Sequence, residues 1–480
     1  MTISLTEQSY TNLLKTIEYK ASMYAKTTSS DQKKKLGQFF TDYRIADFMA
    51  NLFSFNMSHS KKIEILDCGA GHGILSISLL NILVKKGYKN IDLMLYEIDS
   101  GVIKDLDYNL KEFKQDHHGI NFHYSIIERN FILDPIDKKF DLIISNPPYF
   151  KLNKKDPEAT AMDHVVHGQP NIYMLFMAKS ADLLKDHGEM VFITPRSFTS
   201  GTYFKKFREY LLDTVSLDHI HIFNTRRDHF KNESILQETI ITKFSKDHSK
   251  EITITTSEDS TFDDINTLHT SKDLIIENYR NIICIPSSQA DIEILDTFHA
   301  TPNTIQDLGY KISTGKVVTF RNKELLSTTP ENLFECNTEY SPLLWMHNFK
   351  NETLTFPLDN KKEQYIECSD RSRSLLVPTQ NYLLIKRFSS KEQHRRINIG
   401  YLYKNDLKTK YVGLENHLNY LYREDKELTK NEMKDLGSFL VSGVVDQYFR
   451  ILNGNTQVNA TDILHLPVPP QLYKGYECHD

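Results

Sequence analysis

Apolar runs and amphipathic stretches alternate along the first half of the chain. The apolar runs predict buried strands at 63–66, 91–96, 122–127, 140–144, 188–195, 217–223 and 238–244. Stretches with apolar residues at helical spacing predict helices at 1–30, 43–53, 74–84, 172–184 and 204–212. Strands that alternate with helices favour a doubly wound, Rossmann-like α/β domain with seven strands, the last two forming a hairpin.

The alternation of strands and helices ends well before the chain does. We expect a helical extension over 1–30, the α/β domain over 31–245 and a polar linker or excursion over 246–289. From 290 to 480 the alternation disappears, and we expect a second domain of mixed α+β structure there. A chain of 480 residues is long enough for two or three domains.

Composition and charge narrow the class of protein. The chain is 40% hydrophobic and 25% charged, as ordinary globular proteins are. Its formal net charge of −5 excludes an all-over basic coat, so a nucleic-acid binder would need its positive charge gathered in a cleft. The five cysteines lack paired spacing, which predicts neither a disulfide framework nor a metal site. Without a signal-peptide pattern or a stretch long enough to span a bilayer, we expect a cytoplasmic protein with no membrane partner.

A glycine-rich loop follows the first predicted strand. It runs from Asp67 to Gly73 as Asp-Cys-Gly-Ala-Gly-His-Gly and precedes the helix predicted at 74–84. Glycines at this place let the backbone approach a ligand closely at a helix N-terminus. The spacing differs from the Gly-x-Gly-x-x-Gly of dinucleotide enzymes, and the Gly-Lys-Ser/Thr of a P-loop is absent. The loop therefore predicts a ligand other than NAD or ATP.

The next two strands also end in residues suited to a ligand. Glu97 follows the strand at 91–96 and is placed to accept hydrogen bonds from a ribose diol, although an acid there can also cap a solvated helix. Asn130 and Phe131 follow the strand at 122–127, and the aromatic ring could pack on an adenine. In open α/β sheets ligands bind at the carboxyl ends of the strands, so these residues are predicted to share a site.

The fourth strand ends in Ser145-Asn146-Pro147-Pro148-Tyr149. The prolines end the strand because neither has an N–H to donate, and the first of them biases Asn146 to an extended conformation. The Asn146 side-chain oxygen and the Pro147 carbonyl are two acceptors for a planar amino group, whose ring could lie on Tyr149. An amino nitrogen held in this way aims its lone pair at an electrophile. The same residues could instead form an Asx-type turn that only closes the strand.

Three segments in this order resemble the gamma-class DNA adenine-N6 methyltransferases of restriction–modification systems. They are 37–41 (Gly-Gln-Phe-Phe-Thr), 67–73 and 146–149. Nearer the C-terminus, 381–396, 413–419 and 453–462 are similar to segments of Eco57I- and PstI-type methylases. The resemblance touches nearly the whole chain. It implies that 31–245 is a methyltransferase domain and that 290–480 is a target-recognition domain that binds DNA.

The resemblance implies S-adenosylmethionine as the cofactor. The cofactor-binding residues would be Thr41, Asp67, Gly69, Gly71, Glu97, Ile98, Asn130, Phe131 and Pro148. Thr41 would contact the methionine moiety and Glu97 the ribose hydroxyls, while Ile98 and Phe131 would sandwich the adenine. The family usually has Asp where this chain has Asn130, whose amide oxygen can still accept a hydrogen bond from the adenine amino group.

The resemblance also assigns catalytic and DNA-binding residues. The catalytic residues would be Asn146, Pro147, Pro148 and Tyr149, which bind and stack on an adenine flipped out of the duplex. Phe230 is positioned like an aromatic on the other face of that base, or is a plain loop residue. The densest basic run would contact DNA, or form a solvated helix face; its residues are Lys386, Arg387, Lys391, Arg395 and Arg396.

These assignments imply partners and leave alternatives. We expect double-stranded DNA as the substrate, a separate cognate restriction endonuclease rather than a fused one, a bacterial host, and a monomer that modifies one strand at a time. An rRNA adenine or protein glutamine methyltransferase is one alternative, because those substrates also present planar amino groups. A non-catalytic DNA-specificity subunit is the other, and the intact cofactor loop and catalytic residues argue against it.

Overall fold

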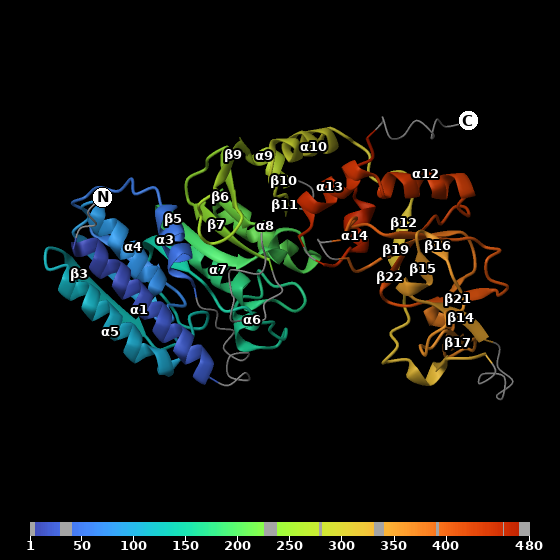
Figure 1. The fold of residues 1–480 in the computed structure, drawn as a ribbon, viewed down its shortest axis with the longest axis horizontal. Helices are drawn as coiled ribbons and strands as arrows, with labels where there is room; N and C mark the ends of the chain where they lie inside the picture. The colour runs from blue at the N-terminus through green and yellow to red at the C-terminus, as the bar shows by residue number, and fades with distance from the viewer. Residues whose placement is uncertain are drawn as a thin grey trace. The chain divides into compact units, whose positions relative to one another are not determined.

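The computed structural model of the 480-residue chain describes residues 5–28, 41–224, 238–277, 281–330, 340–389, 393–454 and 456–469. The contacts within the chain divide it into two compact units, Met1–Gln289 and Ala290–Asp480. Figure 1 colours the first unit from blue to yellow and the second from yellow to red. Two of the predicted site residues, Phe230 and Lys391, lie outside the described residues.

The first unit is built on a sheet with nine strands among its described residues. These are β1 (Ile63–Asp67), β2 (Asn90–Tyr96), β3 (Asn121–Ile127), β4 (Phe140–Ser145), β5 (Leu184–Pro195), β6 (Ser216–Phe223), β7 (Thr239–Ser245), β8 (Glu251–Ser257) and β9 (Asn266–Ser271). They lie in the order β3-β2-β1-β4-β5-β7-β6-β8-β9. Strands β1 to β5 pair in parallel, and β7 is antiparallel to both β5 and β6. The predicted antiparallel pairing of the last two expected strands is therefore confirmed.

The sheet has two more strands than the seven predicted, and they come from the segment 246–289. Strand β8 pairs with β6, and β9 pairs with β8, so much of the predicted linker or excursion extends the sheet. The sequence Glu-Ile-Thr-Ile-Thr at the start of β8 alternates apolar and polar residues, as a strand does. Ile252 and Ile254 are buried, which is the physical reason for the added strand.

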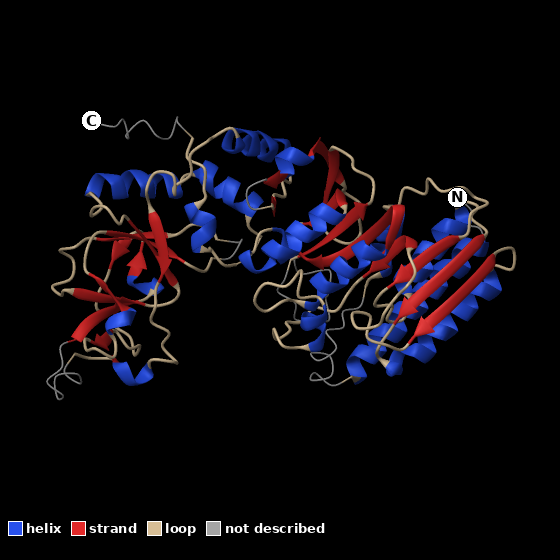
Figure 2. Cartoon of the chain, turned by 180° about the vertical axis from the view of Figure 1, so that it is seen from behind, coloured by secondary structure: helices blue, strands red, loops and turns tan. Residues whose placement is uncertain are grey.

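Helices cover both faces of this sheet. They are α1 (Leu5–Thr27), α3 (Tyr43–Asn51), α4 (Ile74–Lys85), α5 (Ser100–Asp116), α6 (Pro157–Ala161), α7 (Ile172–Leu183), α8 (Lys205–Thr214) and α9 (Lys272–Ile275). Figures 1 and 2 show α1, α4 and α5 against one face of the strands β1 to β3, and one continuous apolar core joins these elements. The five predicted helices are present with small shifts at their ends, whereas α5, α6 and α9 are additional helices.

The second unit contains two small sheets and several helices. Its sheets have the strand orders β12-β22-β19-β20 and β13-β17-β14-β21-β18 among the described residues. The remaining strands of the chain are β10 (Ile276–Glu277), β11 (Ile282–Ile283), β12 (Lys311–Thr314), β13 (Leu326–Ser327), β14 (Tyr340–Leu344), β15 (Phe349–Lys350), β16 (Thr353–Leu354), β17 (Tyr365–Glu367), β18 (Leu376–Pro378), β19 (Tyr382–Lys386), β20 (Ile399–Leu402), β21 (Tyr411–Leu414) and β22 (Leu418–Tyr422). The remaining helices are α10 (Gln289–His299), α12 (Lys430–Leu440), α13 (Gly443–Leu452) and α14 (Ala460–Leu464).

Two apolar clusters hold the second unit together. One lies between the two sheets and includes Leu384, Val412 and Leu418, and the other includes Val317 and Leu325. None of the helices in the described part of the chain is long and apolar enough to cross a membrane.

Candidate functional site

Predicted cofactor-binding and catalytic residues follow β1, β2 and β4, where the strand order of the first sheet reverses. Strand β1 lies between β2 and β4, with Asp67 level with Leu95 on one side and Ile144 on the other. The loops after β1, β2 and β4 therefore leave the sheet at the same edge, which is where open α/β sheets bind ligands. A Cβ atom on Gly69 would lie 3.6 Å from the carbonyl oxygen of Asn146, so the glycine loop and the Asn-Pro-Pro-Tyr segment are neighbours.

Hydrogen bonds on both sides fix the side-chain amide of Asn146. Its Nδ2 donates to Thr41 Oγ1 at 3.0 Å. Its Oδ1 accepts from the Tyr149 hydroxyl at 2.6 Å, and that hydroxyl also lies 2.8 Å from the carbonyl oxygen of Ile193. An amide oxygen can accept two hydrogen bonds, so the bond to Tyr149 does not by itself use up the Asn146 acceptor.

Both the hydroxyl and the ring of Tyr149 have fixed contacts. Burial raises the pKa of Tyr149 well above its ordinary value, so the hydroxyl stays protonated and can donate. The ring packs edge-on against Tyr173, with 6.1 Å between ring centroids. We predicted Tyr149 as a stacking face; the structure adds a hydroxyl that orients Asn146, which the linear motif does not reveal.

The glycine loop requires glycine where it turns into α4. Gly73 caps that helix with φ +86°, a conformation that favours glycine, and a Cβ there would lie 2.6 Å from Leu106 Cδ1. Gly71 donates its N–H to Glu97 Oε2 at 2.7 Å, and Asp99 donates its N–H to Glu97 Oε1 at 2.8 Å. Glu97 thus joins the loop after β1 to the loop after β2.

Asp67 places a buried carboxyl group at the start of this loop. It is fully buried, and Ser76 Oγ donates to its Oδ2 at 2.7 Å. Its Oδ1 has no hydrogen-bond partner among the residues that the structure describes. Burial is the main cause that raises the pKa of Asp67 to about 7; hydrogen bonds from Ser76 and Gly69 oppose the rise, and the charge of Glu97 adds to it. A buried acceptor without a partner is a place where a polar ligand can bind.

The residues expected around an adenine differ in how open they are. Ile98 is 55% exposed, as expected for an apolar side chain that a ligand would cover. Phe131 is buried, with its ring near Tyr96 and Phe176, so it offers a ligand little area. Asn130 Oδ1 accepts from the backbone N–H groups of Ile132 and Leu133, at 3.0 and 3.3 Å.

The prediction for Asn130 needs correction on this geometry. An amide oxygen accepts two hydrogen bonds, and both are already made within the turn, so Asn130 acts here as a turn cap. Its Nδ2 donates to Glu158 Oε1 at 2.7 Å.

One supporting residue, Lys179, is not among the predicted site residues. Lys179 of α7 donates to the carbonyl oxygens of Phe131, Ile132 and Asp134 at 2.6, 3.0 and 2.6 Å, which pins the turn after β3. Its position in an otherwise apolar helical stretch was the available signal, because a buried lysine requires partners.

Comparisons with known proteins agree with this geometry. Residues 20–230 match the family described as Eco57I restriction-modification methylase. The Type II methyltransferase M.PstI of Providencia stuartii is 33% identical over 92% of this chain and 89% of that protein. The Type II methyltransferase M.BsuBI of Bacillus subtilis is 35% identical over 91% of this chain and 88% of that protein.

This chain belongs to the family of Eco57I- and PstI-type restriction–modification methyltransferases. Among solved structures, the Type IIL restriction-modification enzyme MmeI in complex with DNA has a similar fold. The TM-score is 0.59 at 15% identity, over 93% of this chain and 70% of that one. The methyl donor of such methyltransferases is S-adenosylmethionine.

The ends of β1 and β2 suit this cofactor. Asp67 and Glu97 place carboxyl groups at these two strand ends, and Ile98 presents an open apolar surface. Burial also raises the pKa of Glu97, which makes its charge more dependent on donors around it.

In the second unit of this methyltransferase, the basic run divides into exposed and buried residues. Arg395 is exposed, with Nη1 3.9 Å from Glu352 Oε1. Lys386 is half-buried, which lowers its pKa, and it lines a 460 Å³ pocket together with Arg395. Arg387 Nη1 donates to the carbonyl oxygen of Asn416 at 3.2 Å.

Arg396 corrects one prediction. It is fully buried, with Nε donating to Ser389 Oγ at 3.1 Å and Nη1 donating to the Asn453 carbonyl oxygen at 3.0 Å. Its guanidinium also lies 5.7 Å from the Phe449 ring centroid. An arginine enclosed in this way holds the unit together and cannot reach DNA.

Asp67 should make the stability of the folded protein fall as the pH rises. Its pKa is raised from 3.8 to about 7, so between these values the folded chain holds a proton that the unfolded chain has released. The associated stability is fully present below the lower value and is lost as the pH rises through the upper one. Asp67→Asn removes this titration, so the variant should lose less stability between about pH 4 and 7, by at most about 1.4 kcal/mol per pH unit.

Denaturant unfolding of wild type and Asp67→Asn across this pH range measures the difference. Asp163→Asn, which changes an exposed carboxylate of the same unit, controls for the loss of a negative charge. Parallel pH profiles for wild type and Asp67→Asn would contradict the assignment.

The neighbouring arginines of the second unit should respond differently to the same change. Arg396→Met leaves the Asn453 carbonyl and the Ser389 hydroxyl without their donor, which should cost about 1–3 kcal/mol of unfolding free energy. Arg395→Met, at an exposed position, should stay within about 0.5 kcal/mol of wild type. Equal effects of the two substitutions, measured by urea unfolding, would show that the burial of Arg396 does not matter.

Proposed function

We propose that this chain transfers a methyl group from S-adenosylmethionine to the N6 amino group of an adenine turned out of a DNA duplex. In this proposal the adenine lies in a short recognition sequence, and its methylation protects DNA from a separate cognate endonuclease. The observation that carries the proposal is the fixed amide of Asn146 at the strand-order reversal, beside the glycine loop.

Asn146 and Pro147 act on the amino group of the target base. With Nδ2 tied to Thr41, the amide cannot turn over without losing a hydrogen bond, so its oxygen keeps facing away from Thr41. That oxygen and the Pro147 carbonyl would accept the two hydrogens of the amino group. Acceptors held in place stabilise the positive charge that develops on the nitrogen and need no rearrangement during the reaction.

Tyr149 serves the same base in two ways. Its ring would stack on the adenine, which is worth on the order of 1–3 kcal/mol and offsets part of the cost of extruding a base. Its hydroxyl lies between Asn146 Oδ1 and the Ile193 carbonyl oxygen and can donate to either. The hydroxyl therefore keeps the amide oxygen in position when the base is absent.

The first unit would also hold the methyl donor. S-adenosylmethionine, when bound, supplies a methyl group on a positively charged sulfur. Glu97 would accept from its ribose hydroxyls, Ile98 would cover one face of its adenine, and Thr41 and the Asp67 to Gly71 loop would contact its methionine part. Positioning of this kind accounts for much of the rate in a transfer that needs no covalent enzyme intermediate.

The second unit would bind the DNA. The relatives M.PstI and M.BsuBI match across nine-tenths of the chain, which includes this unit, and this favours the DNA substrate over an rRNA or protein substrate. Of the predicted basic run, Lys386, Arg387 and Arg395 stay candidates for phosphate contact. Arg396 does not, because it is buried.

Replacing Asn146 should separate chemistry from binding. Asn146→Ala removes one preorganised acceptor, so methylation should fall about 10²- to 10³-fold while DNA binding persists. Transfer of tritiated methyl groups to DNA and a gel-shift assay measure the two properties. Asn153→Ala, an exposed asparagine a few residues further along, should retain activity. Methylation by Asn146→Ala within about tenfold of wild type would refute the assigned role.

A further inference from the structure

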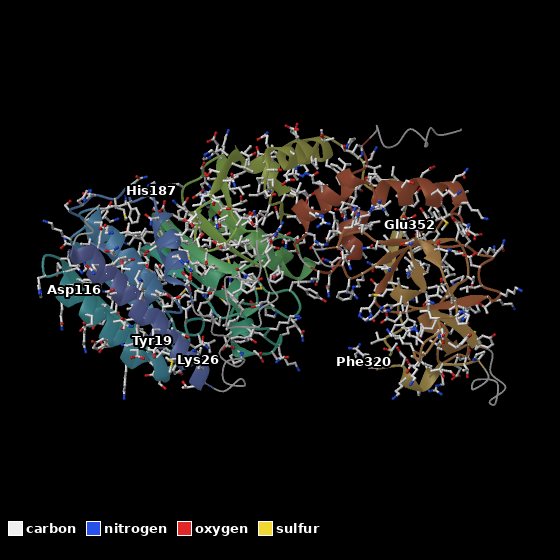
Figure 3. All side chains as sticks on the ribbon, viewed as in Figure 1. Tyr19, Lys26, Asp116, His187, Phe320 and Glu352 are labelled. Carbon is white, nitrogen blue, oxygen red and sulfur yellow. The ribbon has the colours of Figure 1, made fainter. Side chains whose placement is uncertain are left out.

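Phe320 is the most exposed large hydrophobic side chain in the described part of the chain. It is 78% exposed, and Figure 3 shows it projecting from the edge of the second unit. A single exposed apolar residue is ordinary in itself. What distinguishes Phe320 is the rigid turn that carries it and the charges around it.

Hydrogen bonds close that turn on itself. Arg321 and Asn322 donate their N–H groups to the carbonyl oxygen of Val318 at 2.9 and 3.0 Å. The Asn322 side chain returns the bond, because its Oδ1 accepts the N–H of Val318 at 2.9 Å. Phe320 therefore stands at the tip of a closed turn, which limits the freedom of its backbone.

The turn is also anchored at both ends. Val317 and Leu325 are buried in the same apolar cluster as Leu343 and Ile366. Just before Val317, a Cβ on Gly315 would lie 2.3 Å from the carbonyl oxygen of Glu415, so the backbone there is packed against its neighbour. The two ends of the turn therefore belong to the apolar core, while its tip is exposed to solvent.

Val317, at the start of the turn, is hydrogen-bonded to the segment 413–419, which resembles a segment of the family. Val317 donates its N–H to the Leu414 carbonyl oxygen at 3.1 Å, and Asn416 donates its N–H to the Val317 carbonyl oxygen at 3.0 Å. The segment 413–419 was singled out in the sequence but has no role in the chemistry. Arg387 binds the carbonyl oxygen of Asn416, so the same segment also supports the basic run.

An arginine lies against the exposed ring, and two further cations are exposed in the same segment. The Arg321 guanidinium carbon lies 5.4 Å from the Phe320 ring centroid, and Arg321, Lys316 and Lys323 are all exposed. Glu324 is the exposed acid of the same segment. Flat apolar surface among cations suits nucleic acid, because stacked bases lie directly inside a phosphate backbone.

We propose that Phe320 is a wedge that enters the DNA duplex and stacks on a base of the recognition sequence, while Arg321 and Lys316 contact the adjoining phosphates. This inference rests on the proposed DNA methyltransferase function. Apolar side chains inserted between base steps unstack them and bend the duplex. A rigid tip suits this task, since little conformational freedom remains to be lost on binding.

The test uses the full chain and a duplex that contains the sequence it methylates. Phe320→Ala should weaken duplex binding roughly 5- to 150-fold and lower kcat/KM, whereas Phe320→Trp should restore both. The slope of log affinity against log salt should stay unchanged in Phe320→Ala. In Arg321→Gln that slope should fall by about one unit, because one phosphate contact is lost.

A spectroscopic readout detects the wedge itself. With 2-aminopurine in turn at each purine of the recognition sequence, wild type should raise the fluorescence at one position, and Phe320→Ala should abolish that rise at saturating protein. Tyr19→Ala, which removes an aromatic that is 66% exposed on α1, is the matched control and should leave binding, rate and fluorescence unchanged.

The outcomes separate the two proposals. Wild type that methylates DNA, together with Phe320→Ala that matches it in affinity, rate and fluorescence, overturns the wedge alone. Wild type that methylates no DNA overturns the proposed function on which the wedge rests. An unchanged melting temperature of Phe320→Ala, expected for an exposed side chain, excludes misfolding as the cause of a loss.

Discussion

The parallel pairing of β1 with β4 is the constraint on which the candidate site depends. It places the residues after Asp67 beside the residues after Ile144, although they are far apart in the sequence. The glycine loop can then pass close to the Asn146 backbone, because Gly69 has no side chain to separate them. The proposed closeness of cofactor and target base follows from this adjacency.

Within that frame, the orientation of one amide decides what the site can do. Thr41 accepts from Asn146 on one side and Tyr149 donates to it on the other. These partners come from different parts of the first unit, which allows the amide oxygen to be oriented before any substrate arrives. Such preorganisation is the main resource of an enzyme whose substrate is already a nucleophile.

The wedge proposed for Phe320 follows the same logic in the second unit. A turn with buried ends, closed by backbone hydrogen bonds, carries the exposed ring of Phe320. In the first unit Thr41, from a segment that resembles the family, accepts a hydrogen bond from Asn146. In the second unit the segment 413–419 is hydrogen-bonded to Val317 at the start of the turn that carries Phe320.

Much of this arrangement is readable from the sequence, and the remainder has physical reasons to escape it. Short apolar runs ending in Asp67, Glu97 and Asn146 predict their place at one sheet edge, because parallel strands share their carboxyl ends. Helix α5 and strand β8 also carry readable periodicity, although neither is among the predicted elements.

Other features depend on contacts between distant segments. Nothing local distinguishes the exposed Arg395 from the buried Arg396, and their difference comes from packing against α13 and the chain after it. The hydrogen bonds by which Asn130 caps its turn form only in the folded chain. The same is true of the hydrogen bonds from Lys179 to that turn.

The most direct test of the account is to read the DNA of a methylation-free bacterial host that expresses this chain. Single-molecule long-read sequencing detects N6-methyladenine at each position. We expect one short sequence motif with the same adenine modified at nearly every copy. Unmodified DNA from cells in which the protein is present and binds S-adenosylmethionine would contradict it, and would point to an amino group on RNA or protein.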